Sequence, residues 1–144
     1  MVKVNFYDSI DDKLLKFAVI IAKTNGKWIF CKHRERDTYE IPGGHREDGE
    51  EILSTARREL AEETGATDFT IQPICVYSVM GKTRVSENDD AETFGMLFLA
   101  EVFSFEEIRS EIENILITED LIENWTYPHI QPKLIEEAKR RQYL

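Results

Sequence analysis

Two neighbouring segments near the N-terminus carry apolar side chains on both faces of an extended chain. Residues 15–22 are apolar apart from Lys16, and residues 27–32 point apolar side chains in both directions. In the second segment Trp28 and Phe30 face one way, and Ile29 and Cys31 face the other. Between the segments, Asn25-Gly26 favours the positive φ angles of a tight hairpin turn. A strand that is apolar on both faces needs cover on both sides. The pattern therefore predicts a hairpin within a sheet that is sandwiched between helices.

The spacing of apolar residues and the turn signals predict the remaining elements. We expect a helix over residues 50–64, with Asp48 as its N-terminal cap and Gly65 at its C-terminal end. The apolar residues of this helix that we expect to face the sheet are Ile52, Leu53, Ala56 and Leu60. Further strands are expected at residues 70–80, 93–103 and 115–118, helices at 105–112 and 132–142, a short extended piece at 39–44 and a polar loop at 82–92.

Length and charge restrict the function classes. The 144 residues contain no linker or internal repeat, which predicts one domain over residues 1–144. The net charge of −10 disfavours polymeric nucleic acid and anionic membranes as partners, because a negative field repels both. The longest apolar run is far shorter than the roughly 20 residues that span a bilayer. No signal peptide is evident, so we expect a cytoplasmic protein that acts on small molecules, as a monomer or a homodimer.

The two cysteines do not indicate a disulfide or a zinc site. Cys31 and Cys75 are far apart, neither belongs to a CxxC motif, and both have strand-like apolar neighbours. We expect them to be small hydrophobic core residues in the reduced state.

Three carboxylates lie within one turn of the expected helix. Glu59, Glu62 and Glu63 have i, i+3, i+4 spacing, so they repel one another unless a cation lies between them. Clustered carboxylate oxygens suit Mg²⁺ or Mn²⁺. Acidic runs also occur on solvated helix faces, where they bind nothing. The preceding turn, Gly43-Gly44, favours the metal site because its backbone can approach a ligand closely.

The whole segment resembles the signature of the Nudix hydrolases, GX5EX7REUXEEXGU, in which U is a bulky aliphatic residue. The matching positions are Gly44, Glu50, Arg58, Glu59, Leu60, Glu62, Glu63 and Gly65, and the chain departs only at Ala66, a packing position. The resemblance implies an α/β/α sandwich with a mixed β-sheet. It also implies Mg²⁺-dependent (or Mn²⁺-dependent) hydrolysis of a nucleoside diphosphate that is linked to another group.

The resemblance further implies roles for residues inside the signature. Glu59 and Glu63 are expected to bind metal, together with the Gly43 carbonyl and with Glu62 nearby. Glu59 is expected to orient or deprotonate the attacking water. The catalytic candidates are Glu59 and the neighbouring Glu62. Arg58 is expected to be structural and to hold the ligand-bearing turn by pairing with Glu62 or Glu50.

Residues outside the signature are less firmly assigned by the resemblance. Glu113 is the candidate for a further metal ligand or base, with Glu111 second, and either is equally compatible with a solvated charge. Arg34 and His33 are candidates for binding substrate phosphate or base, and Glu40 and Gly44 for facing the substrate. His45 and His129 are expected to be surface residues.

The resemblance leaves the substrate open. The nearest overall resemblance is to the small MutT-like members, which convert nucleoside triphosphates, including oxidised ones such as 8-oxo-dGTP, to the monophosphate and pyrophosphate. Where such members have a purine-binding Asn before Glu-Pro, this chain has Ile130 before Gln131-Pro132, and Ile130 cannot hydrogen-bond a base. Hydrolysis of ADP-ribose, nucleotide sugars or dinucleoside polyphosphates is an alternative. A regulator that binds nucleotide without cleaving it is another, although such proteins usually lose signature glutamates that this chain keeps.

Overall fold

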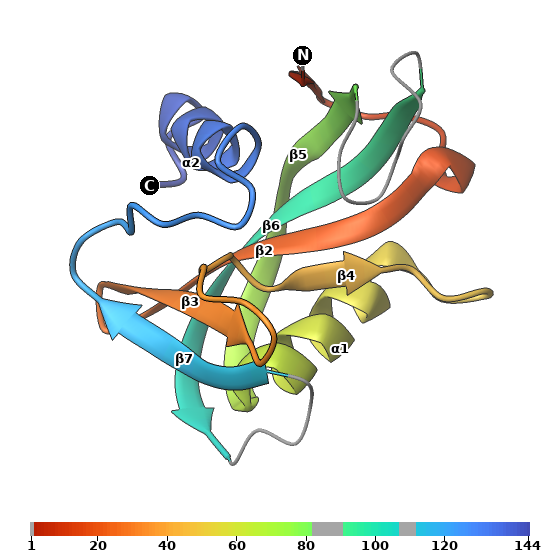
Figure 1. Ribbon diagram of the computed structural model, residues 1–144. Coiled ribbons are helices and arrows are strands. Elements are labelled where there is room, and N and C mark those ends of the chain that lie inside the picture. Colours follow the sequence, from red (N-terminus) through yellow and green to blue (C-terminus); the bar gives the residue numbers. More distant parts are fainter. Residues whose placement is uncertain (1, 82–90, 107–111) are drawn as a thin grey trace.

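The computed structural model describes residues 2–81, 91–106 and 112–144. A seven-stranded mixed sheet lies at its centre (Figure 1). The strands are Lys3–Tyr7 (β1), Leu15–Thr24 (β2), Lys27–His33 (β3), Gly43–His45 (β4), Ala66–Met80 (β5), Glu92–Phe105 (β6) and Ile112–Thr118 (β7). Their order is β1-β5-β6-β2-β3-β7, with β4 pairing separately with β2. The β2–β6 pair is parallel and the other pairs are antiparallel, which confirms the mixed sheet.

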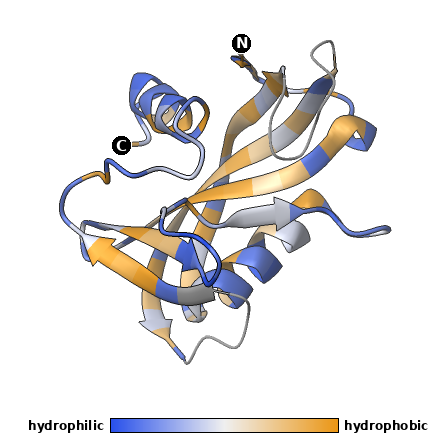
Figure 2. Cartoon of the chain, in the orientation of Figure 1, coloured by the Kyte–Doolittle hydropathy of each residue, from blue (hydrophilic) through white to orange (hydrophobic). Residues whose placement is uncertain are grey.

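Two helices cover opposite faces of this sheet, with α1 (Ile52–Thr64) on one side and α2 (Gln131–Arg140) on the other (Figure 1). A short 3-10 helix, Asp12–Leu14 (η1), precedes β2. The core under α1 contains Ile20 and Ile29, and the core under α2 contains Ile21 and Phe30. Neighbouring residues of β2 and β3 therefore point into different cores, as the sequence predicted. Figure 2 shows the apolar residues concentrated in the strands and a hydrophilic loop between β4 and α1.

The predicted hairpin turn and the predicted C-terminal end of α1 are confirmed, but the predicted start of α1 is wrong. Asn25 and Gly26 have φ angles of 51° and 78°, which confirms the turn between β2 and β3. Gly65 ends α1 in the left-handed conformation at φ 79°, as expected. The predicted cap at Asp48 is wrong, because the chain turns again at Gly49, where φ is 77°, and α1 begins only at Ile52.

Several boundaries also differ from the predictions. Leu53 is 38% exposed and does not face the sheet. Phe105 ends β6 and Ile112 begins β7, so the helix predicted over residues 105–112 is wrong at both ends. Residues 107–111 and 82–90 lie outside the described residues, so the rest of that helix and most of the predicted polar loop are not tested. Strand β1, which pairs with β5, was not predicted from the sequence.

Strand β4 brings the glycine turn against β2. A Cβ atom on Gly43 would lie 2.6 Å from the carbonyl oxygen of Ala18, so this close approach requires glycine.

No helix in the described ranges is long and apolar enough to cross a bilayer.

Candidate active site

A cavity of about 410 Å³ opens where β3, β4 and α1 meet. Its acidic side is formed by the stretch from Gly43 to Glu63, which we call the acidic segment (residues 43–63). Residues of this segment that line the cavity include Gly43, Gly44, Arg58, Glu59 and Glu63. Residues distant in sequence, such as His33 and Gln131, complete the wall.

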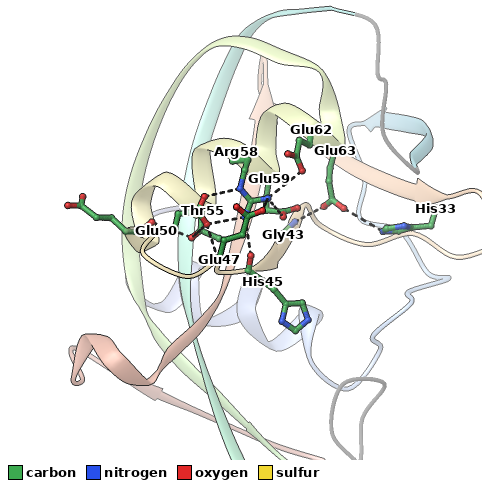
Figure 3. A network of polar contacts seen from close by, with 11 residues as sticks. His33, Gly43, His45, Glu47, Glu50, Thr55, Arg58, Glu59, Glu62 and Glu63 are labelled. Atoms are coloured by element: carbon green, nitrogen blue, oxygen red, sulfur yellow. Dashed lines mark hydrogen bonds and ion pairs between the residues drawn. The ribbon is translucent and has the colours of Figure 1, made fainter.

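Arg58 holds the acidic segment together (Figure 3). Its guanidinium donates to both carboxylate oxygens of Glu50, at 2.8 and 3.0 Å, and to the His45 carbonyl at 3.0 Å. It also donates to Glu59 Oε1 at 2.7 Å. A bidentate pair of this kind fixes orientation as well as charge. The predicted structural role of Arg58 toward Glu50 is therefore visible in its contacts, which join the loop before α1 to the helix.

The same contacts shift the protonation of Glu50. Hydrogen bonds from Arg58 and then from the Thr55 hydroxyl lower the pKa of Glu50 to about 2. Hydrogen bonding to Glu50 correspondingly raises the pKa of Arg58. Both groups are therefore charged throughout the physiological range, and the contact between loop and helix persists across it.

Gly44 makes room for the carboxylate of Glu59. A Cβ atom at Gly44 would lie 2.4 Å from Glu59 Cδ and 2.6 Å from both carboxylate oxygens. Only glycine therefore lets this carboxylate lie against the turn. The glycine and the glutamate, 15 positions apart, form one wall of the cavity.

Glu63 lies deeper than the other acidic residues of α1. It is 7% exposed, its Oε1 accepts a hydrogen bond from the Gly43 amide at 2.8 Å, and its Oε2 lies 3.6 Å from His33 Nε2. By contrast, the Glu62 side chain is 52% exposed, and its carboxylate lies 3.5 Å from Arg58. Glu62 is absent from the residues that line the cavity, so its roles in catalysis and metal binding stay predictions.

The donor set has the chemistry that a hard divalent cation prefers. Across the described ranges, no three His, Cys, Asp or Glu side chains are gathered closely enough to hold a metal ion by themselves. Mg²⁺ does not need such a cage, because it keeps several waters and binds proteins through one or two carboxylates together with substrate phosphates. Glu59 and Glu63 supply two carboxylates to one cavity, and Gly44 leaves space beside them. The residues present therefore fit Mg²⁺ or Mn²⁺.

The structure separates the candidates that precede the acidic segment. Glu40 is 7% exposed and lines the cavity, as expected for a residue that faces the substrate, and it lies 3.3 Å from His33. Arg34 is exposed and is absent from the cavity wall. Arg36 lines the cavity instead and donates to Glu40 at 2.9 Å. The chain turns after β3, with the Arg36 amide bonded to the His33 carbonyl, and this turn carries Arg36 back over the site.

The remaining candidates lie in different places. His45 is exposed, as predicted, and it also lines the cavity. Its carbonyl accepts a hydrogen bond from Arg58, and its imidazole points away from the carboxylates in Figure 3 and packs against Phe17. His129 is exposed, as predicted. Glu113 belongs to β7, but its side chain lies outside the described residues, as does the whole of Glu111. Cys31 and Cys75 are buried and free, as predicted.

A second, smaller cavity of about 100 Å³ adjoins the first, and we call it the aromatic cavity. The residues that line both cavities are Phe17, Val19, Tyr77, Tyr127 and Gln131. A Cβ atom at Gly95 would lie 2.8 Å from the Tyr77 ring, so this glycine lets the ring lie flat across the neighbouring strand. The sequence did not predict that these residues meet, because they come from β2, β5 and the region of α2, and no local spacing connects them.

Two curated proteins of Bacillus subtilis (strain 168) are similar to this chain. YtkD, provisionally named as an 8-oxo-dGTP diphosphatase, is 36% identical over 84 residues, which cover 58% of this chain and 52% of YtkD. An ADP-ribose pyrophosphatase is 36% identical over 100 residues, which cover 67% of this chain and 50% of that protein. The chain thus spans about half the length of these relatives.

A solved structure supports the fold, and a family profile identifies the chain. The crystal structure of a mutant of the Bacillus subtilis pyrophosphohydrolase BsRppH is similar, with a TM-score of 0.77 and 24% identity, covering 99% of this chain and 92% of that one. The profile of the NUDIX domain matches residues 13–138, which include the acidic segment, α1 and most of α2. The chain therefore belongs to the Nudix family.

Proposed function

We propose that this chain hydrolyses a nucleoside triphosphate to the monophosphate and pyrophosphate with the help of Mg²⁺ or Mn²⁺. The observation that carries the proposal is the junction of two unlike cavities. The acidic one holds Glu59 and Glu63, and the aromatic one can accept a flat, uncharged ring. A nucleotide has these same two parts, a polyanionic chain and a base.

Each residue of the acidic cavity has a part in the proposed reaction. Water attacks a phosphorus atom of the triphosphate, the bond from that atom to the bridging oxygen breaks, and pyrophosphate leaves. The Glu59 carboxylate, held by Arg58, accepts the proton of the attacking water. Glu63 and the Gly43 carbonyl, with Glu62 and Glu113 as further candidates, complete the metal-binding set. A bound divalent cation would neutralise the phosphates and lower the pKa of water.

Arg36 is the cavity cation best placed to contact substrate phosphate. Its Nη1 atom lies against Glu40, and a guanidinium presents further N–H donors beyond that one contact. The guanidinium of Arg58, the other arginine of the cavity wall, already donates hydrogen bonds to Glu50, Glu59 and the His45 carbonyl. Glu40 therefore contacts both Arg36 and His33, and it holds them at the edge of the acidic cavity where we expect the phosphates to bind.

The relatives favour two substrate classes. The similarity to YtkD supports a nucleoside triphosphate, including oxidised forms such as 8-oxo-dGTP. The similarity to an ADP-ribose pyrophosphatase supports a diphosphate linked to a second group as the alternative.

The deciding experiment is a product-resolved screen with Mg²⁺. The substrates are the nucleoside triphosphates, 8-oxo-dGTP, ADP-ribose, a nucleotide sugar, a dinucleoside polyphosphate and a 5′-triphosphorylated oligonucleotide. We expect triphosphates to yield orthophosphate only after inorganic pyrophosphatase is added, because the product is pyrophosphate. Turnover of ADP-ribose alone would replace the proposed substrate, and no turnover of any compound would leave a nucleotide-binding regulator.

A further inference from the structure

Gln131 is a buried polar residue at the boundary between the two cavities. It is the first residue of α2, is 6% exposed and lines both cavities. Its Oε1 accepts a hydrogen bond from the Ile41 amide at 2.9 Å. This bond joins α2 to the strand-like piece just before the glycine turn.

The Ile41 contact decides which way the side-chain amide faces. A backbone N–H can only donate, so the Gln131 carbonyl must face Ile41 and the NH₂ group must face away. Among the described residues the Gln131 NH₂ group has no hydrogen-bond acceptor. In the same part of the chain, every fully enclosed side-chain nitrogen or oxygen has a partner. The NH₂ group is therefore open to the space where the two cavities meet, and it presents hydrogen-bond donors and no acceptor there.

The neighbours of this NH₂ group favour a base over a phosphate. The side chains that share both cavities with Gln131 are two tyrosines, Phe17 and Val19, none of them cationic. Burial raises the pKa of Tyr77, so its hydroxyl stays neutral. A phosphate would lose its hydration here without gaining a positive partner, whereas a base can stack on the rings and accept a hydrogen bond at its edge.

We propose that Gln131 reads the base and selects keto bases over amino bases, an inference that rests on the proposed nucleotide hydrolysis. At position 6 of purines and position 4 of pyrimidines, some bases accept a hydrogen bond and others donate one. Guanine, hypoxanthine, uracil and thymine have an accepting oxygen there, and adenine and cytosine have a donating amino group. Because Ile41 occupies the carbonyl of Gln131, the side chain cannot turn round to accept from an amino group. An amino base would therefore leave two donors facing each other.

The test compares kcat/KM for matched pairs of substrates, ITP against ATP and UTP against CTP. We expect the wild-type protein to prefer the keto member of each pair by roughly 10-fold or more. Gln131→Glu keeps an acceptor for the Ile41 amide and replaces the donor with an acceptor, so it should lower the keto/amino ratio at least ~10-fold. Gln131→Met removes the donor without adding charge and should bring the ratio close to one.

Ratios separate base reading from a loss of folding, because a damaged fold slows both members of a pair equally. Gln72→Glu, at an exposed position of β5, is the matched control for the added charge and should leave the ratios unchanged. Equal rates within both pairs for the wild type, or ratios unchanged in both Gln131 variants, would overturn the proposal.

Binding distinguishes this proposal from the proposed function. Calorimetry with IDP and ADP makes the same comparison without turnover. Tighter binding of IDP by a protein that hydrolyses no nucleotide would refute the hydrolase and support the base reader. Hydrolysis without any keto preference, and with equal binding of IDP and ADP, would support the hydrolase and refute the base reader.

Discussion

The acidic segment and the aromatic cavity lie side by side but are held together in different ways. Residues 43–63 are one continuous piece of chain, joined by the bonds from Arg58 to Glu50 and Glu59. The aromatic cavity has no such internal connection. Its walls come from β2, β5, β6 and the region of α2, and residues of these elements meet on one face of the sheet.

This difference suggests that the acidic segment carries out the reaction and that the aromatic cavity selects the substrate. A polar site that is built from one local segment can keep its geometry while the surrounding walls change. A cavity that is built from distant elements can change its shape and hydrogen-bonding groups without disturbing the carboxylates. We therefore expect changes in the acidic segment to alter the rate for every substrate, and changes around Gln131 to alter which substrate is preferred.

The largest expected effect comes from removing one carboxylate charge from the acidic segment. Glu59→Gln and Glu63→Gln should each reduce kcat at least ~100-fold for all substrates, because each removes a proposed metal ligand or base. Circular dichroism should show an unchanged fold. Glu136→Gln, an exposed change on α2, is the matched control. A wild-type rate in either variant, or a fall confined to one base, would contradict the division between the two regions.

A smaller effect is expected at the edge of the acidic cavity. Arg36→Ala should raise KM roughly 10-fold for all phosphate substrates, since a charge-assisted contact is lost, with little change in keto preference. Arg34→Ala should leave KM within about two-fold, because Arg34 is exposed and lies outside the cavity wall. Steady-state kinetics on both variants decides between the arginine that the sequence suggested and the one that the fold places at the site. A larger effect at Arg34 would reverse the assignment.

The smallest effect concerns stability in acid. The pKa of Glu50 is about 2 in the folded chain against an ordinary value of 4.5, so the unfolded chain binds more protons between these values. The stability that comes from the Arg58 contact is therefore complete above about pH 4.5 and is lost as the pH falls toward 2.

Denaturant unfolding across this range is the measurement. Glu50→Gln should flatten the decrease in unfolding free energy relative to wild type. Glu92 and Glu137 also have lowered pKa values and contribute in the same direction, so some decrease should remain in the variant. Parallel curves for the two proteins would show that the contact adds nothing to stability.

Local patterns in the sequence predicted the elements that depend on neighbouring residues. The turn at Asn25-Gly26 and the end of α1 at Gly65 were predicted correctly, because positive φ angles have a strong residue preference. The start of α1 was not, because the chain turns again at Gly49, after the predicted cap Asp48, and α1 begins only at Ile52. Strand β1 was missed because its pairing with β5 brings together residues 69 to 77 positions apart.

The sequence by itself determined the sandwiched sheet, the α1 segment and the identity of its acidic residues, because these follow from alternation, helical spacing and glycine turns within a short stretch of chain. Only the tertiary structure decided that Arg36 rather than Arg34 reaches the cavity, that Glu59 lies against Gly44, and that Gln131 lies between the two cavities with its carbonyl toward Ile41. The reason is physical. The direction of each of these side chains is set by contacts across the fold, with the Gln131 carbonyl held by an amide 90 residues away, and no local pattern encodes such a contact.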